Sequence, residues 1–459
     1  MLFHSKPLKI FQRSLGRHKV LTSQEDLLTY SYDVSFNRSI PQVVVLAEST
    51  EDVLTAVNFA IDEGYKITPR GAGTGMSGGA IPLKGGMVIS TERMNHILDF
   101  NVHEKYMVVE PGITTAQVQD EATAQGLFYP PDPSSYKVSS IGGNVAENAG
   151  GLRCVKYGTT KHYVLGLEFV TSRGEICCTG SLNQRSDTYD LTPLLVGSEG
   201  TLGIITRIAL KLIEAPAGRG TMQAFFPSLE LAGNSVLEIM AAGIVPSVCE
   251  LMDKSVLDAI TAYTGTPLPP KTEALLLIEV DGSGEEVKTG MEEIKSLCRN
   301  RQAVEIQSTE DPVEAEKLWT LRRSISPSLA RLARGKINED VSVPRSKLPE
   351  LLKQANRIGK RYGLMIPCFG HAGDGNIHVN VMYNPDDTLE KKRAFQAVEE
   401  VFREVVRLEG SISGEHGIGT VKRDYMRLQM ASGELDTLRR IKEAFDPENL
   451  FNPGKIIPD

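Results

Sequence analysis

A glycine-rich loop near the N-terminus restricts the possible fold more than any other part of the sequence. Residues Arg70–Gly79 read RGAGTGMSGG and contain Gly73-x-Gly75-x-x-Gly78, the spacing of the dinucleotide-binding fingerprint. In the Rossmann fold that fingerprint opens a helix whose N-terminus faces the pyrophosphate. Here Pro82 and Gly85-Gly86 follow, and then an apolar run at 87–90 that predicts a strand. The sequence therefore argues against a Rossmann fold. It leaves two readings, an anion-binding nest of backbone N–H groups or an ordinary flexible loop.

The residues before this loop predict a strand, a helix and a second strand. An apolar run at 42–47 is followed by Ser49 and Thr50, either of which can cap a helix that ends at Gly64, and 65–69 forms the second strand. The helix is expected to bury the apolar positions Val53, Leu54, Val57, Ala60 and Ile61. A later helix, from about Lys392 to Glu409, is expected to bury Phe395, Val398, Phe402 and Val405.

Three further segments with little side-chain bulk follow the loop. They are PPDPSS at 130–135, SSIGGNVAENAGG at 139–151 and LVGSEGTLGIIT at 195–206. Small residues allow a ligand to approach the backbone closely. Four such segments between residues 70 and 206 favour a single extended ligand that lies along one domain, and a dinucleotide has the right size.

Length, charge and cysteine content limit the class of protein. A chain of 459 residues exceeds what one hydrophobic core supports, so two or more domains are expected. The net charge of -8 argues against nucleic acid as a partner, and the chain has no apolar run long enough for a transmembrane segment. Its N-terminus lacks the continuous apolar core of a signal peptide. The six cysteines form no C-x-x-C pair, which predicts free thiols, a cytoplasmic location and no iron–sulfur cluster.

Two histidines near the C-terminus can be placed together by counting. In CFGHAGDGNIHVNV, a two-residue turn at Asp374-Gly375 would set His371 opposite His378, with Cβ atoms roughly 5 Å apart. Glu415 lies in a later glycine-rich segment, GSISGEHGIG at 410–419. Two histidines and a carboxylate suit zinc or another divalent metal with a vacant position for substrate. The alternative is that these histidines are structural.

Taken together, these motifs resemble the flavoproteins of the vanillyl-alcohol-oxidase or PCMH type. The closest likeness is to the branch with the glycolate oxidase flavin subunit, D-lactate dehydrogenase and D-2-hydroxyglutarate dehydrogenase. It covers nearly the whole chain and includes the closing FDPENLFNPGK. The resemblance implies an α+β protein with a PCMH-type two-subdomain FAD-binding domain, a ferredoxin-like α+β substrate cap and a C-terminal segment that returns to the flavin. The expected domains are an N-terminal helical segment at 1–37, the FAD-binding domain at 38–216, the cap with the metal site at 217–420 and the closing segment at 421–459.

The same resemblance implies which residues hold FAD. The pyrophosphate would be bound by Arg70, Gly71, Ala72, Gly73, Thr74, Ser77, Gly78 and Gly79. The flavin would be lined by Pro131, Asp132, Ser134, Ser140, Gly142, Gly143 and Asn144. The adenine and ribose side would be completed by Gly197, Ser198, Glu199, Gly200, Ile204 and Ile205, and Asn452 would close over the ring. Some relatives carry a histidine that bonds covalently to flavin. Because Ala72 and Thr74 stand in that region here, FAD is expected to be bound non-covalently.

The implied reaction is FAD-dependent oxidation of a small D-2-hydroxy acid, D-lactate or glycolate, to the 2-oxo acid. Hydride would pass to flavin N5, and the metal on His371, His378 and Glu415 would polarise the hydroxyl. His416 is the expected general base. If 318–326 is one helix, Trp319, Arg322 and Ser326 share a face, and Arg322 would hold the substrate carboxylate, with Arg323 as the alternative. Asn380 is a candidate second contact.

Substrate size, electron acceptor and assembly stay open. Relatives specific for a larger diacid place a lysine where this chain has Asn338, which favours a monoacid over D-2-hydroxyglutarate. A flavin-dependent non-redox transferase and a module with a structural metal are further alternatives. Electrons would leave to a separate acceptor: an electron-transferring flavoprotein, an iron–sulfur subunit or a quinone system. The assembly could be a homodimer or a hetero-oligomer.

Overall fold

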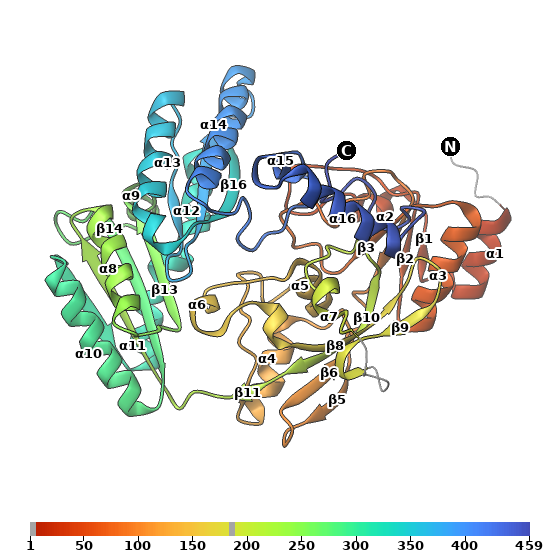
Figure 1. The fold of residues 1–459 in the computed structure, drawn as a ribbon, viewed down its shortest axis with the longest axis horizontal. Helices are drawn as coiled ribbons and strands as arrows, with labels where there is room; N and C mark the ends of the chain where they lie inside the picture. Colours follow the sequence, from red (N-terminus) through yellow and green to blue (C-terminus); the bar gives the residue numbers. More distant parts are fainter. Residues whose placement is uncertain (1–5, 183–188) are drawn as a thin grey trace. The chain divides into compact units, whose positions relative to one another are not determined.

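The chain forms two units, and each unit draws on separate stretches of sequence. The structure, a computed structural model, describes residues 6–182 and 189–459 (Figure 1). The first unit comprises residues 1–150, 159–215 and 416–459, and the second comprises 151–158 and 216–415. The C-terminal residues therefore belong to the same unit as the N-terminal ones.

The first sheet of the first unit carries the strands that flank the glycine loop. Its order is β1-β2-β4-β3, with bounds Val20–Leu21, Val43–Leu46, Met87–Ser90 and Ile67–Arg70. Strands β2, β4 and β3 are parallel, and the loop begins where β3 ends. Helix α3 (Thr50–Glu63) lies between β2 and β3, with Ser49 as its N-cap and Gly64 at a φ of +72° as its C-cap. The predicted order of strand, helix, strand, loop and strand is confirmed.

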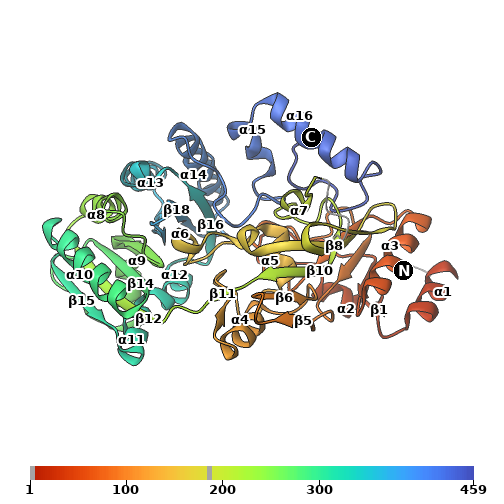
Figure 2. The ribbon, with the colours of Figure 1, turned by 60° about the horizontal axis from the view of Figure 1, so that its bottom comes forward.

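Helices α3 and α1 (Lys6–Leu15) pack on this sheet (Figures 1 and 2). Within α3, Val53, Val57 and Ala60 are buried as predicted, but Ile61 is 41% exposed, so its predicted burial is wrong. The buried stripe instead includes Ala56, which lies closer to the centre of the buried face.

A second sheet and several short elements complete the first unit. The sheet has the order β5-β6-β10-β8-β9, with bounds Ile97–Asn101, Tyr106–Val109, Ile204–Lys211, Val164–Val170 and Ile176–Cys178. A two-stranded ribbon pairs β7 (Leu127–Phe128) with β11 (Ile213–Glu214). The helices are α2 (Gln24–Thr29), α4 (Thr115–Ala124), α5 (Ile141–Glu147), α7 (Thr192–Leu195), α15 (Met426–Gln429) and α16 (Ser432–Phe445), with 3₁₀ turns at Thr160–Tyr163, Gly180–Leu182 and Arg423–Tyr425.

The second unit is built on one antiparallel seven-stranded sheet of order β15-β12-β14-β13-β17-β18-β16. The strand bounds are Glu305–Thr309, Gly218–Phe226, Ala274–Gly282, Val248–Asp253, Cys368–His371, Asn376–Tyr383 and Gly335–Ser342. The helices are α6 (Cys154–Tyr157), α8 (Leu229–Ala241), α9 (Lys254–Thr264), α10 (Gly284–Asn300), α11 (Pro312–Arg323), α12 (Ile325–Leu332), α13 (Leu348–Tyr362) and α14 (Thr388–Arg407), with a 3₁₀ turn at Arg345–Lys347.

This sheet contains the same βαββ arrangement twice. Strands β12 to β15, with α8 and α10, form a βαββαβ unit in the ferredoxin-like spatial order 4-1-3-2, and α9 is inserted between β13 and β14. Strands β16 to β18, with α13 and α14, repeat the pattern in the order 2-3-1. In place of a fourth strand, Ser411 forms an isolated bridge with Ser342 at the edge of β16. The two repeats meet where β13 pairs with β17.

The two faces of the seven-stranded sheet are packed differently. Helices α9, α11 and α12 cover one face through an apolar cluster that includes Met252, Leu277 and Phe369. Glu250, His371, His378 and Asn380 lie on this same face, because side chains alternate along each strand. Helix α14 packs against β18 and β16; its Val398, Phe402 and Val405 are buried as predicted, whereas Phe395 is 42% exposed.

Candidate metal centre and glycine cradle

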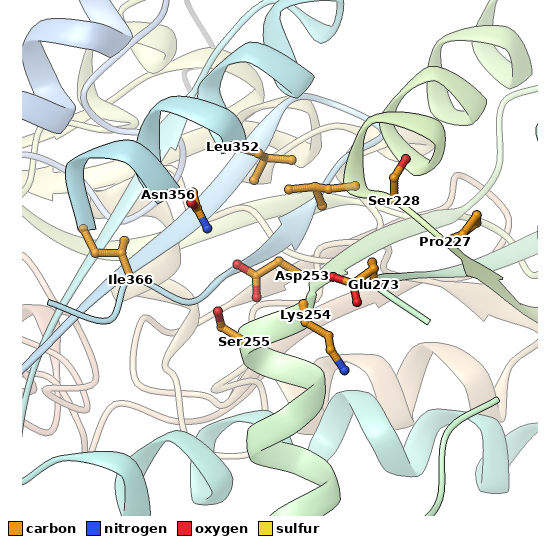
Figure 3. A pocket seen from close by; sticks show the side chains of 10 residues that line it. Pro227, Ser228, Asp253, Lys254, Ser255, Glu273, Leu352, Asn356 and Ile366 are labelled. Atoms are coloured by element: carbon orange, nitrogen blue, oxygen red, sulfur yellow. The ribbon is translucent and has the colours of Figure 1, made fainter. Parts of the chain in front are cut away.

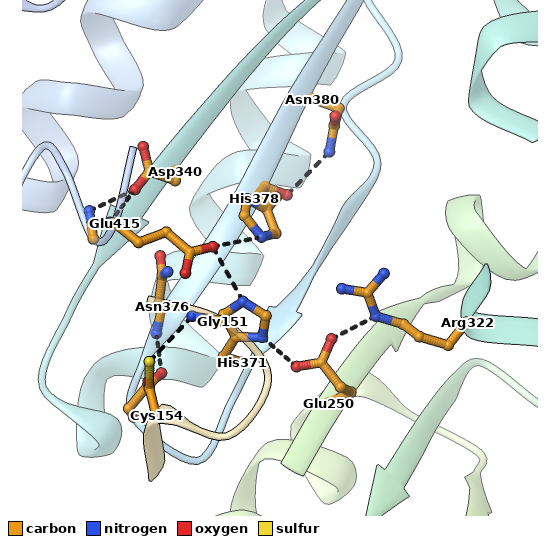
Figure 4. A network of polar contacts seen from close by, with 12 residues as sticks. Gly151, Cys154, Glu250, Arg322, Asp340, His371, Asn376, His378, Asn380 and Glu415 are labelled. Carbon is orange, nitrogen blue, oxygen red and sulfur yellow. Dashed lines mark hydrogen bonds and ion pairs between the residues drawn. The ribbon is translucent and has the colours of Figure 1, made fainter. Parts of the chain in front are cut away.

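Three side chains of the second unit form a cluster with the geometry of metal ligands. One ligand atom from each of His371, His378 and Glu415 lies within 4.8 Å of the other two. Glu415 Oε1 lies 3.2 Å from Nε2 of His371 and 3.5 Å from Nε2 of His378 (Figure 4). Both histidines are buried and Glu415 is nearly so. The three residues that the sequence predicted as ligands are therefore brought together.

The hairpin between the two histidines is wider than predicted. His371 pairs with Asn376 and Phe369 with His378, so the connection has four residues, Ala372–Gly375, and not two. The carbonyl of His371 accepts hydrogen bonds from the N–H groups of Asp374 and Gly375, which builds a turn inside the loop. The partner of His371 thus moves by two positions. A shift of two keeps side chains on the same face, so the imidazoles still meet diagonally, with ring centroids 5.4 Å apart.

Glu415 is held in place through its backbone. Asp340 of β16 lies opposite His378, and its carboxylate accepts hydrogen bonds from the N–H groups of Gly414 and Glu415 (Figure 4). Position 414 requires glycine, because a Cβ there would lie 2.2 Å from Oδ1 of Asn376. The bridge between Ser342 and Ser411 holds the segment that leads to Glu415 at the edge of the sheet.

Glu250 connects this cluster to Arg322 and was not foreseen from the sequence. Its Oε1 contacts Nδ1 of His371, and its Oε2 accepts a 2.5 Å hydrogen bond from Nε of Arg322 (Figure 4). Burial opposes the ionisation of Glu250, but the charges of His371 and Arg322 outweigh it and lower the pKa of Glu250 to about 2. One signal was present in the sequence, since SVCELM places a single acid inside an apolar strand. A buried acid needs a buried partner.

The electrostatics of the cluster favour positive charge. Burial alone would disfavour a charged imidazole, but the carboxylates of Glu250 and Glu415 outweigh it and raise the pKa of His371 well above its usual value. A proton and a metal cation are both attracted to such a group of donors.

The arginine pair predicted on α11 separates into an inward and an outward residue. Arg322 is 15% exposed, and its guanidinium carbon lies 5.0 Å from the centroid of the Phe369 ring. Arg323 is 57% exposed and pairs with Glu316 at the surface. The prediction of one helix face through Ser326 is wrong, because α11 ends at Arg323 and α12 begins at Ile325. Pro327 cannot continue the hydrogen bonding of α11, and Ser326 is exposed.

Asn380 is fully buried on the same strand face as His378. Its Nδ2 donates to the carbonyls of Pro367 and His378 at 3.2 Å, while its Oδ1 is buried and accepts no hydrogen bond within the described residues. Asn338 of β16 lies directly opposite, and its Oδ1 is likewise buried and accepts no hydrogen bond within the described residues. His416, the predicted base, follows Glu415 and belongs to the first unit.

In the first unit, the predicted nucleotide-binding segments lie side by side. A Cβ at Gly71 would meet Oγ of Ser140 at 2.2 Å, so the glycine loop touches the start of α5. The N–H groups of Gly197 and Glu199 donate to carbonyls of α5, at Val145 and Ala146. Asn452 donates from Nδ2 to the carbonyls of Gly79 and Glu199. Four stretches of sequence therefore meet in one place, although far apart in the chain.

The remaining predicted residues of the first unit are placed as follows. Pro131, Asp132 and Ser134 lie in the connection between β7 and α5, where Gln119 binds the Pro131 carbonyl. Ile204 and Ile205 begin β10, and Ile204 is buried. Gly142, Gly143 and Asn144 lie in α5, and Ser198 and Gly200 flank Glu199.

The glycine loop rests on a buried arginine. Arg70 donates from Nη1 to the carbonyls of Tyr32 and Ala80, and its guanidinium carbon lies 5.5 Å from the Tyr30 ring centroid. Gly73 has a φ of +70°, and a Cβ there would lie 2.2 Å from Nη2 of Arg70. Gly78 has a φ of +86° and would meet Thr420 at the same distance. Ala72 and Thr74 alternate with Gly71, Gly73 and Gly75, so few side chains cover the backbone of the cradle.

Glu199, predicted to line the nucleotide, uses its carboxylate to hold the chain. It accepts hydrogen bonds from the N–H groups of Ile418 and Gly419, both at 2.7 Å. Burial raises the pKa of Glu199 to about 7, although these two N–H groups act in the opposite direction. These hydrogen bonds fix the loop that follows His416 to the rest of the first unit.

A separate cavity of about 310 Å³ lies in the second unit, at the far end of β13 from Glu250 (Figure 3). Asp253, the N-cap of α9, lines it together with Ser228, the N-cap of α8. None of the predicted site residues lines this cavity.

The sequence also predicted that the chain has no transmembrane segment and that its cysteines are free thiols. Within residues 6–182 and 189–459, no helix has the length and apolar character that a membrane crossing needs. All six cysteines lie in the described part of the chain and are free thiols, as predicted.

Two family models match successive parts of the chain, and several relatives align with nearly all of it. Residues 41–180 match the model described as FAD binding domain, and residues 215–456 match FAD linked oxidases, C-terminal domain. The glycolate oxidase subunit GlcD of Bacillus subtilis is 40% identical, with 94% of this chain and 92% of the relative aligned. The D-lactate dehydrogenase of Anaerostipes hadrus is 33% identical over 97% and 96%. The D-2-hydroxyglutarate dehydrogenase of Stutzerimonas stutzeri is 31% identical over 95% and 96%.

Solved structures show the same fold at low sequence identity. p-Cresol methylhydroxylase with substrate bound superimposes with a TM-score of 0.83 at 18% identity, covering 99% of this chain and 96% of that one. Alkyldihydroxyacetonephosphate synthase gives a TM-score of 0.75 at 19% identity, with coverage of 97% and 84%. The predicted PCMH-type fold is confirmed by these neighbours.

Proposed function

The chain belongs to the FAD-linked oxidase family, and we propose that it oxidises a small D-2-hydroxy acid, D-lactate or glycolate, to the corresponding 2-oxo acid. Relatives named for glycolate, D-lactate and D-2-hydroxyglutarate align over nearly the whole chain, which supports hydroxy acids as the substrate class. The observation that carries the proposal is the cluster of His371, His378 and Glu415, linked through Glu250 to Arg322. It offers a cation site next to a sheet and, on a helix packed against the same sheet face, an arginine that can bind a carboxylate.

The glycine cradle fits FAD. Backbone N–H groups in the left-handed turns at Gly73 and Gly78 can bind a pyrophosphate without a side chain in the way. FAD, when bound, supplies the acceptor for the hydride that leaves C2 of the substrate. Because Ala72 and Thr74 offer no imidazole, we expect a non-covalent complex.

The histidine cluster fits a divalent metal. Two imidazoles and one carboxylate are a common ligand set for a zinc site that keeps a position open for substrate. The orienting contact from Glu250 to Nδ1 of His371 is typical of metal-binding histidines. A cation held there would polarise the substrate hydroxyl and stabilise the alkoxide.

The protein's own groups would then orient the acid and remove one proton. Arg322 would bind the substrate carboxylate, while Glu250 keeps its guanidinium in a fixed orientation. The carboxamide of Asn380 would contact the same substrate. An imidazole nitrogen of His416 would accept the hydroxyl proton. Electrons would leave to a separate acceptor, either an electron-transferring flavoprotein, an iron–sulfur subunit or a quinone system.

Metal removal tests the proposal directly. Protein that holds FAD but has been dialysed against a strong zinc chelator is expected to lose bleaching of its flavin by D-lactate or glycolate under anaerobic conditions. Added Zn²⁺ or another divalent metal should restore it. A panel of D- and L-hydroxy acids in the same assay identifies the substrate. Full bleaching after complete metal removal would contradict the role of the cation, and no bleaching by any hydroxy acid would favour a non-redox reaction.

Substrate size is expected to depend on Asn338. Its carboxamide faces Asn380 across β16 and β18, on the side of the sheet that carries His378. Asn338→Lys would place a cation where a second carboxylate of a diacid could lie. We expect kcat/KM for D-2-hydroxyglutarate relative to D-lactate to rise by at least about 10-fold, since one new ion pair accounts for such a factor. Asn338→Gln is the control without charge, and an unchanged ratio in Asn338→Lys would place the distal end of the substrate elsewhere.

A further inference from the structure

Glu250 is the buried acid between the two halves of the proposed site. We propose that it is a positioning residue that couples the metal site to the substrate-carboxylate site, so that one side chain sets both the affinity for metal and the affinity for substrate. This inference rests on the proposed function, because it concerns how His371 and Arg322 are held for that reaction.

The position of Glu250 in the sheet supports this coupling. Glu250 of β13 pairs directly with His371 of β17, at the only strand pair that joins the two βαββ repeats within the described residues. Its side chain is fully buried. The two partners come from separate stretches of the chain, since His371 lies on β17 in the second repeat, whereas Arg322 lies in the last turn of α11, between the two repeats. The carboxylate therefore joins parts of the second unit that are far apart in the sequence.

Its two oxygens are used by different partners. Oε1 contacts Nδ1 of His371, so a hydrogen stands on Nδ1, and Nε2 is directed at Glu415, 3.2 Å away. Oε2 accepts from Nε of Arg322. A carboxylate engaged on both oxygens cannot rotate to favour one partner without loss of the other.

The contact also selects which edge of Arg322 is offered to a ligand. With Nε bound to Glu250 and the guanidinium above the Phe369 ring, the terminal nitrogens point toward the side where His378 and Asn380 lie (Figure 4). Phe369 in turn packs against His378, with ring centroids 5.0 Å apart. An incoming carboxylate can therefore meet a guanidinium edge whose orientation is already fixed.

The charge balance fits the same role. Arg322 without Glu250 would be a buried cation that draws any nearby carboxylate, including that of Glu415, away from the histidines. Glu250 neutralises Arg322 locally, so Glu415 stays with His371 and His378. Substitution by an amide keeps an oxygen for the His371 N–H but turns an NH₂ group toward the Arg322 N–H, where two donors oppose each other.

The test compares Glu250→Gln with a matched control in the FAD-loaded protein. Glu279→Gln also removes a buried acid from the same sheet face, where Glu279 pairs with Arg219 and Trp319 and contacts no proposed ligand. Metal affinity is measured without turnover, by titration of Zn²⁺ against a coloured chelator. Substrate affinity is the KM for the hydroxy acid at saturating Zn²⁺. We expect Glu250→Gln to weaken Zn²⁺ binding by at least about 10-fold, as orienting partners of metal histidines do, and to raise KM by at least about 30-fold, while kcat changes less.

Combination with Arg322→Gln separates positioning from general damage. Arg322→Gln should raise KM but leave Zn²⁺ affinity within about threefold, and the double variant should have the KM of Arg322→Gln alone, because Glu250 acts on substrate only through Arg322. Additive KM effects, or a Glu250→Gln protein with either Zn²⁺ affinity or KM unchanged, would overturn the inference.

If Glu250→Gln does not retain FAD, Glu250→Asp keeps the charge but is too short to reach both partners, and at least one of the two affinities must fall. Failure of the unaltered protein to bind Zn²⁺ or to bleach would instead refute the proposed function.

Discussion

Replacement of His371 by alanine is expected to slow anaerobic reduction of the flavin by at least about 10³-fold, equivalent to about 4 kcal/mol of activation free energy. Two effects combine in this one change. The loss of a ligand nitrogen reduces the cluster to His378 and Glu415, and the buried carboxylate of Glu250 loses a partner. FAD should stay bound, since most of the residues that match the FAD-binding model, 41–180, belong to the first unit and His371 belongs to the second.

Stopped-flow absorbance of the flavin measures this effect, with metal content determined on the same samples. His103→Ala is the control, because His103 is exposed in the first unit and should reduce at the normal rate. A normal reduction rate in His371→Ala would remove the metal cluster from the mechanism, even if FAD-dependent oxidation itself were observed.

Gly73→Ala is expected to yield protein with little or no bound FAD. The new Cβ would lie 2.2 Å from Nη2 of Arg70, whose guanidinium is held by carbonyls of Tyr32 and Ala80 and is nearly buried. Either the loop or the arginine must move. The φ of +70° adds strain of about 1 to 2 kcal/mol for any residue with a Cβ. If the loop offers its backbone to the pyrophosphate as proposed, a shift of a few tenths of an ångström removes several hydrogen bonds together.

The ratio of flavin to protein absorbance after purification, followed by titration with FAD, measures this loss. We expect the affinity for FAD to fall by at least about 10²-fold, which corresponds to about 2.7 kcal/mol. Gly126→Ala separates the two causes, because Gly126 has a φ of +72° but a Cβ added there would meet no atom within 4 Å. It should lose some thermal stability and keep FAD. Full FAD occupancy in Gly73→Ala would show that the loop does not bind the cofactor.

Local patterns predicted the elements of this protein better than their registers. The strand, helix and loop between residues 42 and 90 followed from one apolar run, one cap and one glycine end. The face of His371 and His378 was also predicted correctly, although the hairpin register was wrong by two positions, because alternation along a strand survives an even shift. Loop length could not be read from Asp374-Gly375, since the turn is set by N–H groups that bind the carbonyl of His371.

The resemblance to a flavoprotein family supplied the overall fold, which periodicity alone did not. Glu250 was missed because its meaning depends on two partners far away in the sequence, His371 and Arg322. Ser326 was placed on the wrong helix because the sequence of α11 and α12 has continuous helical character, and only Pro327 marks the interruption. Ile61 and Phe395 show the limit of apolar periodicity, since each lies at the margin of its helix's buried stripe.

The ranges of the two units have a practical meaning for protein engineering. By these ranges the polypeptide passes from one unit to the other four times, after residues 150, 158, 215 and 415. The second unit cannot therefore be exchanged between homologues as a single segment. A graft of 216–415 alone would leave behind the octapeptide 151–158, in which Lys156 and Tyr157 bind the carboxylate of Asp281. Chimeras that exchange the second unit should carry both pieces, with the last junction drawn between Glu415 and His416.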